Sequence, residues 1–148
     1  MLFRSALFNI LAPDIEDAVF VDAYAGCGSV GIEAISRGAR KTVFIERAKT
    51  AVEVLRRNLV SLKVMNRSNI VQAKAAIAIA GYAKDAIVFL DPPYPNENEY
   101  AATISRLEES RIVIAQHASR FAIPETFGAL RRHRVVKQGD NSLSFYLP

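Results

Sequence analysis

The sequence predicts an α/β fold in which a doubly wound, mostly parallel sheet of seven strands carries an antiparallel hairpin at its C-terminal end. Segments with helical periodicity alternate with short β-branched or apolar runs along most of the chain. Apolar runs such as residues 86–90 lack polar alternation, as expected for parallel strands covered on both faces. Residues 130–137 and 142–147 flank Gly139-Asp140-Asn141, which is typical of a hairpin turn.

The composition predicts one domain, residues 1–148, with no metal site. Of the 148 residues, 51% are hydrophobic, which is enough for a single core. The single cysteine, Cys27, cannot form an intramolecular disulfide or a multi-cysteine metal site, and it indicates a reducing compartment. We expect a cytoplasmic protein without a membrane segment, because no apolar run approaches the roughly 20 residues that cross a bilayer and no signal peptide is recognisable. The net charge of +4 permits nucleic-acid binding without requiring it.

Helices and strands alternate in the first half of the expected fold. Apolar residues from Phe3 to Leu11 recur at helical spacing and predict a first helix that stops before Pro13. A strand begins at residues 19–21, a helix over residues 29–37 stops at Gly38, and a strand over residues 42–45 ends at Glu46. An apolar stripe then predicts a long helix: Ala48, Val52, Leu55, Leu59 and Leu62.

The alternation continues in the second half. Residues 69–72 predict a third strand, residues 74–82 a short helical stretch, and residues 86–90 a buried strand that ends at Asp91. A helix over residues 97–109 and a strand over residues 111–115 precede the hairpin. These elements complete the seven expected strands.

Two glycine-rich or acidic strand ends indicate a nucleoside cofactor. The turn after residues 19–22 carries Gly26, Gly28 and Gly31, which permit close approach of the backbone to a ligand. By itself this pattern also fits a nicotinamide dinucleotide site or a tight turn without a ligand. Glu46, about 20 residues further on, is placed to accept both hydroxyls of a ribose.

The sharpest signal is Asp91-Pro92-Pro93-Tyr94, directly after a buried strand. The prolines lack N–H donors and hold the backbone rigid, so their carbonyls and the Asp91 carboxylate form a fixed set of acceptors. Such a set suits an exocyclic NH2 group, and Tyr94 offers a flat face on which a base can stack. The alternative is a purely structural role, in which residues 92–93 form a rigid loop and Tyr94 packs against the protein.

These segments resemble the S-adenosylmethionine-dependent amine methyltransferases that carry an (Asn/Asp)-Pro-Pro-Tyr motif. Residues 4–11, 22–37, 46 and 90–94 are similar, more narrowly, to bacterial small-subunit (16S) rRNA guanine-N2 methyltransferases. The resemblance implies a Rossmann-like methyltransferase fold, with Asp91, Pro92, Pro93 and Tyr94 around the target guanine. It also implies a set of residues that bind S-adenosylmethionine: Asp22, Ala23, Tyr24, Gly26, Gly28, Glu46, Arg47, Ala73 and Lys74.

The implied partner is ribosomal RNA, either naked or in the assembled small subunit, and the implied protein is a monomer that needs no metal. The sequence departs from the family in three places. Lys74 stands where an acidic residue usually touches the adenine amine, and His117, which we interpret as structural, lacks the usual preceding glutamate. Only three residues precede Arg4, where relatives carry a basic segment. Either the chain is truncated or other basic residues contact phosphates: Arg4, Arg37, Arg40, Lys41, Arg56, Arg131, Arg132, His133 and Arg134.

Three other functions fit parts of the pattern. The acceptor loop also suits methylation of adenine N6 in DNA or RNA, or of a protein glutamine. Lys74 and the short N-terminal segment fit a catalytically weak RNA-binding or assembly module. A nicotinamide-dependent oxidoreductase would leave residues 91–94 without a role.

Overall fold

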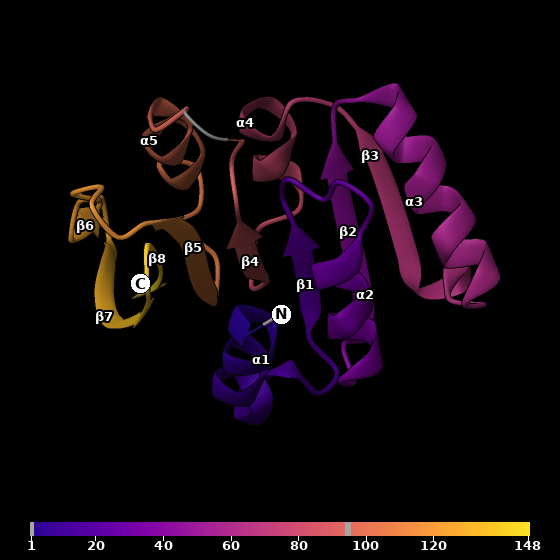
Figure 1. Cartoon of the computed structure of the whole chain (residues 1–148), viewed down its shortest axis with the longest axis horizontal. Coiled ribbons are helices and arrows are strands. Elements are labelled where there is room, and N and C mark those ends of the chain that lie inside the picture. The colour runs from indigo at the N-terminus through magenta and orange to yellow at the C-terminus, as the bar shows by residue number, and fades with distance from the viewer. Residues whose placement is uncertain (1, 94–95) are drawn as a thin grey trace.

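A mixed eight-stranded sheet forms the centre of the computed structural model, which describes residues 2–93 and 96–148 (Figure 1). Its strand order is β3-β2-β1-β4-β5-β8-β7-β6. The first five strands in this order are parallel, and the last three are antiparallel. The strands are β1 (Val19–Asp22), β2 (Lys41–Glu46), β3 (Ser68–Gln72), β4 (Ile87–Leu90), β5 (Ile112–Ala118), β6 (Thr126–Phe127), β7 (Leu130–Gln138) and β8 (Asn141–Leu147).

Helices cover both faces of the sheet, as the doubly wound prediction requires. The helices are α1 (Leu2–Ile15), α2 (Ser29–Ser36), α3 (Lys49–Ser61), α4 (Ala75–Ala78) and α5 (Asn98–Ile104), with short 3-10 turns at Met65–Arg67 and Ile79–Gly81. The first three helices pack on one face of the sheet, and α4 and α5 pack on the other. The strand order reverses between β1 and β4, so their carboxyl ends form the edge at which ligands bind in such sheets.

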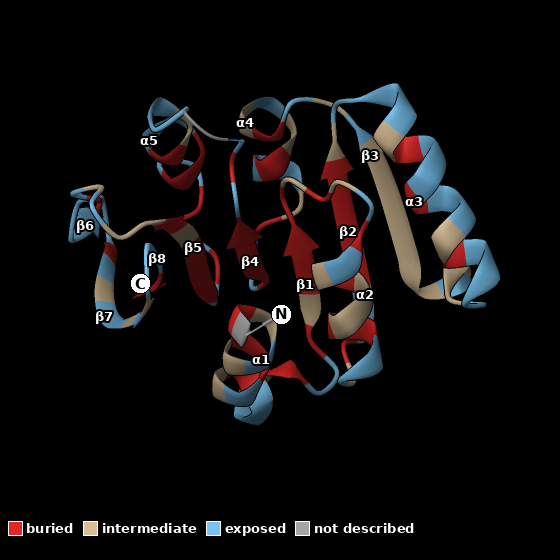
Figure 2. Ribbon diagram, in the orientation of Figure 1, coloured by how far each residue is buried: buried red, intermediate tan, exposed pale blue. Residues whose placement is uncertain are grey.

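Burial follows the position of each strand in the sheet (Figure 2). All four residues of central β4 are buried, whereas edge strand β3 is half-buried and most of β7 is at least partly exposed. Along β1, Phe20 packs toward α1 and Val21 packs toward the opposite core. Apolar residues therefore fill both faces of the central strands, which explains their lack of alternation.

The structure differs from the sequence prediction at two helix ends and at one edge. Helix α1 does not stop before Pro13 but continues to Ile15, because Ile15 is buried and the proline interrupts only the last turn. Helix α5 ends at Ile104 rather than at residue 109, because tight turns through buried Leu107 lead the chain into β5. The two-residue strand β6 adds an eighth strand beside β7.

Helix α2 lies unusually close to β2, and Gly31 makes this approach possible. A Cβ atom on Gly31 would lie 2.3 Å from Cε1 of Phe44 and 2.9 Å from Cγ2 of Thr42. Both neighbours are fully buried, so neither side chain has room to move. The close contact between α2 and the sheet therefore depends on this glycine.

We expect Gly31→Ala to lower the free energy of unfolding by about 1–3 kcal/mol, the usual cost of overpacking a core. Urea unfolding measures this change. Gly81→Ala is the matched control, because a Cβ at Gly81 meets no heavy atom within 4 Å and its φ is not positive. Its stability should stay within about 0.5 kcal/mol of wild type or rise slightly. Equal losses in the two variants would contradict the packing argument.

Candidate functional site

Asp22 ends β1 and holds the start of α2. Its Oδ2 accepts a hydrogen bond of 3.0 Å from the backbone N–H of Gly31, in the first turn of the helix. The N-cap residue Gly28 has a φ of 95° and no side chain with which to cap the helix. Asp22, which is 2% exposed, therefore supplies the acceptor that an N-cap side chain usually provides.

Burial raises the pKa of Asp22 from 3.8 to about 7. The hydrogen bond from Gly31 lowers the pKa, and the charges of Asp91 and Glu46 raise it further. Three carboxylates thus lie near one another at the ends of β1, β2 and β4. This gathering agrees with the expectation that the strand ends form one site.

Glu46, at the end of β2, joins two loops. Its Oε1 accepts a 2.9 Å hydrogen bond from the N–H of Gly26, and its Oε2 accepts a 2.8 Å hydrogen bond from the N–H of Ala48. Each carboxylate oxygen can still accept another hydrogen bond. Glu46 therefore fixes the glycine loop and keeps acceptor capacity toward the neighbouring cavity.

A cavity of about 340 Å³ lies over the ends of β1, β2, β3 and β4, within the usual size range of small-molecule sites. Most of the residues predicted to bind a cofactor line it: Ala23, Tyr24, Gly26, Glu46, Arg47, Ala73 and Lys74. Asp22 and Gly28 do not. Asp22 holds α2, and a Cβ on Gly28 would lie 2.4 Å from Cδ1 of Leu55. The lining residues that sequence reasoning missed are Ile45, Ala75, Ala76, Asn96 and Glu99.

Tyr24 ties the glycine loop to α5. Its hydroxyl donates a 2.8 Å hydrogen bond to Oε2 of Glu99 and lies 2.8 Å from Oγ1 of buried Thr103. Burial raises the pKa of Tyr24, and the adjacent Glu99 raises it further. Tyr24 is therefore a neutral donor that places Glu99 on the wall of the larger cavity.

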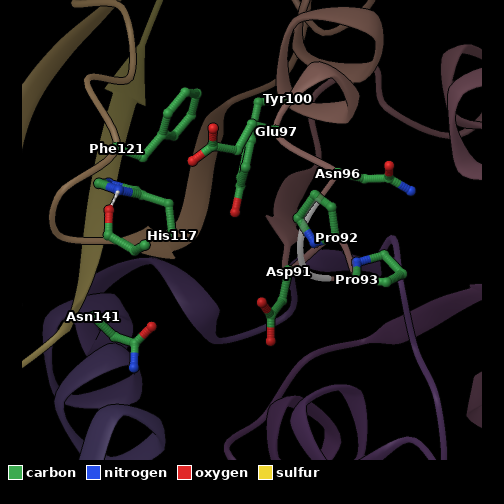
Figure 3. A pocket seen from close by; sticks show the side chains of 10 residues that line it. Asp91, Pro92, Pro93, Asn96, Glu97, Tyr100, His117, Phe121 and Asn141 are labelled. Atoms are coloured by element: carbon green, nitrogen blue, oxygen red, sulfur yellow. Dashed lines mark hydrogen bonds between the residues drawn. The ribbon is translucent and has the colours of Figure 1, made fainter.

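A smaller cavity of about 90 Å³ adjoins the larger one (Figure 3). Asp91, Pro93 and Asn96 line both cavities. The other residues of the smaller cavity come from β4, α5, β5 and β8 and the loops beside them: Pro92, Glu97, Tyr100, His117, Ala118, Phe121 and Asn141. Of the predicted catalytic residues, the structure brings Asp91, Pro92 and Pro93 together here, and Tyr94 lies outside the described residues.

Two of the three carboxylates at strand ends, those of Asp91 and Glu46, have different surroundings. The Asp91 carboxylate opens to the cavities, but the surrounding protein removes part of its water and raises its pKa to about 6. It is therefore mostly ionised at neutral pH and acts as an acceptor of hydrogen bonds. Glu46 instead has both of its oxygens on backbone amides.

His117 presents a neutral ring to the smaller cavity. Its Nδ1 lies 2.9 Å from the carbonyl of Ala118, and its Nε2 lies 2.7 Å from Oγ of buried Ser144. Burial lowers the pKa of His117. Both ring nitrogens are thus engaged within the protein, and the ring packs edge-on against Tyr100 and Phe121.

Residues 2–93 and 96–148 contain no group of three or more His, Cys, Asp or Glu side chains that could hold a metal ion. In the same ranges no helix has both the length and the apolar character that a membrane crossing requires.

The family described as "Conserved hypothetical protein 95" matches residues 2–147. A curated relative from Bacillus subtilis, "Putative rRNA methyltransferase YlbH", is 29% identical over 97% of this chain and 83% of its own length. "Ribosomal RNA small subunit methyltransferase D" of Escherichia coli is 38% identical over 72% of this chain and 54% of its own length. The chain thus spans about half the length of the second relative.

Solved structures agree with the fold. "Putative methyltransferase yhhF" from Escherichia coli matches with a TM-score of 0.89 at 29% identity, over 99% of this chain and 85% of that one. An RNA methyltransferase from Salinibacter ruber, solved in complex with S-adenosyl-L-homocysteine, matches with a TM-score of 0.72 at 18% identity, over 99% and 90% of the two chains. The Rossmann-like α/β fold predicted from the sequence is therefore confirmed.

The buried Asp22 carboxyl predicts a pH dependence of stability. Because folding raises its pKa from 3.8 to about 7, its contribution is fully present below pH 4 and is lost as the pH rises through 7. Asp22→Asn keeps an acceptor for the Gly31 amide but cannot ionise. We therefore expect its free energy of unfolding to rise relative to wild type between pH 5 and pH 8 in urea titrations. Gly81→Ala, which changes no ionisable group, should keep a constant difference from wild type over the same pH range. Parallel curves for Asp22→Asn and wild type would contradict the burial argument.

Proposed function

Since the chain belongs to the family described as "Conserved hypothetical protein 95", and its sequence resembles small-subunit rRNA methyltransferases, we propose that it methylates the exocyclic N2 amine of a guanine in 16S ribosomal RNA. The methyl donor in this proposal is S-adenosyl-L-methionine. The observation that carries the proposal is the pair of adjoining cavities that share Asp91, Pro93 and Asn96. The larger cavity suits a nucleoside cofactor, and the smaller cavity contains hydrogen-bond acceptors for an amine.

The larger cavity fits the proposed cofactor in size and in chemistry. Gly26 has a φ of 57° and open space where a Cβ would be, so a ligand can approach its backbone. Glu46 would accept the ribose hydroxyls, and Ala73 and Ala75 would contact the adenine beside Lys74. Ala23, Tyr24 and Glu99 would surround the methionine part, near Asp91. The cofactor would supply an electrophilic methyl group.

Asp91 and the Pro92 carbonyl would hold the target amine. The lone pair of such an amine is delocalised into the base, so the nitrogen is a weak nucleophile until it becomes pyramidal. Hydrogen bonds from both amine hydrogens to these fixed acceptors favour the pyramidal form and the positive charge that develops on the nitrogen. The N–CH3 bond would form as the S–CH3 bond of the donor breaks to leave S-adenosylhomocysteine, and one N–H proton would pass to Asp91 or to water. Positioning would also accelerate the reaction, because the amine would be held beside the cavity of the methyl donor.

A guanine within a helix cannot reach these acceptors, so the target is an unpaired or extruded nucleotide. Tyr94, which follows the acceptor loop, is proposed to stack on this base and lies outside the described residues. Phe121, Tyr100 and the His117 ring supply aromatic surface to the described wall of the smaller cavity.

We expect wild-type protein to transfer labelled methyl groups to unmethylated 16S rRNA or small subunits, with N2-methylguanosine as the product in nucleoside mass spectrometry. Asp91→Ala should lower kcat by about 100-fold or more, the usual effect of removing one stabilising group from a transition state. Glu53→Ala, on the exposed face of α3, is the control and should leave the rate unchanged. Calorimetry should show that both variants bind S-adenosylhomocysteine and not NAD. Unchanged turnover in Asp91→Ala would contradict the proposal.

The basic residues divide into paired and unpaired groups. Arg4 and Arg37 lie beside Glu33, and Arg40 lies beside Asp17. Exposed Arg131, Arg134 and Lys137 on β7 make no ion pair within the described ranges. Strand β7 leads through the hairpin turn to Asn141, which lines the smaller cavity. Lys137, which pairs with Ser142, lies at the cavity end of the hairpin, and Arg131, which pairs with Leu147, lies at the other end. We therefore propose that β7 contacts phosphates along the RNA strand that leads to the target base.

Replacing Arg131 and Arg134 together by Gln should weaken binding to 16S rRNA and lower the slope of log affinity against log salt by roughly one to two units. Filter binding over a range of salt concentrations measures both quantities. The control replaces Arg56 and Arg57 by Gln, because these exposed arginines lie on α3 at the other end of the sheet. An equal loss of RNA affinity in the β7 and α3 variants would contradict the assignment of RNA binding to β7. An RNA affinity that does not depend on salt would contradict phosphate binding altogether.

A further inference from the structure

The smaller cavity holds a second carboxylate to which the proposed chemistry gives no role. Besides Asp91, the acidic side chain on its wall is Glu97, at the start of α5. Asn141, at the start of β8, lies on another wall of the cavity (Figure 3). The described residues that line this cavity include no lysine or arginine. The cavity is thus rich in acceptors within a chain whose net charge is +4.

The Glu97 side chain is not engaged with its own helix. It occupies the N-cap position of α5, yet its side chain makes no capping hydrogen bond. It also forms no ion pair with any described residue. Figure 3 shows its carboxylate extending from α5 toward the side of the cavity where Phe121 and His117 lie. Both of its oxygens are therefore available to a ligand.

Glu97 and Asp91 line the same cavity of about 90 Å³, together with buried Tyr100. The Tyr100 hydroxyl donates a 2.6 Å hydrogen bond to the carbonyl of Gln116. Burial raises the pKa of Tyr100, and the charges of Asp91 and Glu97 raise it further. A base that occupies this cavity with its amine at Asp91 therefore has Glu97 on the cavity wall.

Nucleobases differ in what stands next to the exocyclic amine. In guanine the N2 amine adjoins N1–H, a donor, and O6 beyond it is an acceptor. In adenine the N6 amine adjoins N1, an acceptor, and in a glutamine side chain the amine adjoins the carbonyl oxygen. A carboxylate beside the amine site can accept a hydrogen bond from N1–H of guanine. With adenine or a glutamine side chain, its oxygen would instead face the lone pair of N1 or of the carbonyl oxygen, which is unfavourable.

We propose that Glu97 determines base specificity by accepting a hydrogen bond from N1–H of the target guanine while Asp91 holds its N2 amine. The Asn141 amide is the candidate donor to O6. This inference rests on the proposed function and deepens it, because it selects guanine over adenine and over a glutamine side chain. Glu97 contacts the base but not the transferred methyl group.

The decisive probe is 2,6-diaminopurine, which keeps the 2-amine but carries an acceptor at N1. Wild-type protein first maps the methylated guanine in unmethylated 16S rRNA, and splinted ligation then places diaminopurine at that nucleotide. We expect wild type to methylate guanine with a kcat/KM about 10- to 100-fold above that of diaminopurine, the value of one charge-assisted hydrogen bond. Glu97→Gln, whose amide can donate to N1, should lose this preference or reverse it.

The controls separate specificity from folding and from the underlying function. Glu53→Gln should keep the wild-type ratio, and calorimetry with S-adenosylhomocysteine should give the same affinity for Glu97→Gln and wild type. A guanine to diaminopurine ratio in Glu97→Gln equal to that of wild type would overturn the role of Glu97 while the proposed function stands. Absence of methyl transfer to RNA by wild type, or a methylated adenine in the mapped RNA, would overturn both.

Discussion

A single buried hydrogen bond, from the Gly31 amide to the Asp22 carboxylate, determines the shape of the site. Gly28 must be glycine because its φ is 95° and because Leu55 occupies the space of a Cβ, so the helix that follows has no N-cap side chain. The strand end supplies the missing acceptor, at the cost of burying a carboxyl group. The loop between Asp22 and Gly28 is thereby held at both ends, and its Gly26 amide meets Glu46.

The division of the sheet edge into two cavities follows from the position of α5. Glu99 lines only the larger cavity, Glu97 and Tyr100 line only the smaller one, and Asn96 lines both. Because neighbouring side chains at the start of a helix point in different directions, this segment forms a wall that the two cavities share. Tyr24 anchors this wall to the glycine loop. A methyl donor and an amine placed on its two sides would approach each other near Asp91, which borders both cavities.

Much of this arrangement was predictable from local pattern. The strand ends at Asp22, Glu46 and Asp91 could be located because each follows an apolar run, and parallel strands bring such ends to one edge. The roles of Asp22 and Gly28 could not be separated from those of Gly26, because loop sequence does not show which groups face a helix and which face a cavity. Glu97 and Glu99 were missed because their contacts depend on how α5 packs, and nothing in their local sequence distinguishes them from solvated charges. The end of α5 depended in the same way on the burial of Leu107.

In the proposed function, the distribution of charge places affinity for RNA and selection of the target base on two different surfaces. Exposed arginines on β7 attract any phosphate backbone, and such attraction carries no information about the base. The carboxylates of the smaller cavity, Asp91 and Glu97, disfavour phosphates and favour groups that present N–H donors. An RNA strand held along β7 can therefore place a base edge in the cavity but not its own backbone. Among the bases, guanine presents adjoining donors at both N1 and N2, so the same negative charge that excludes the backbone favours guanine in the proposed target position.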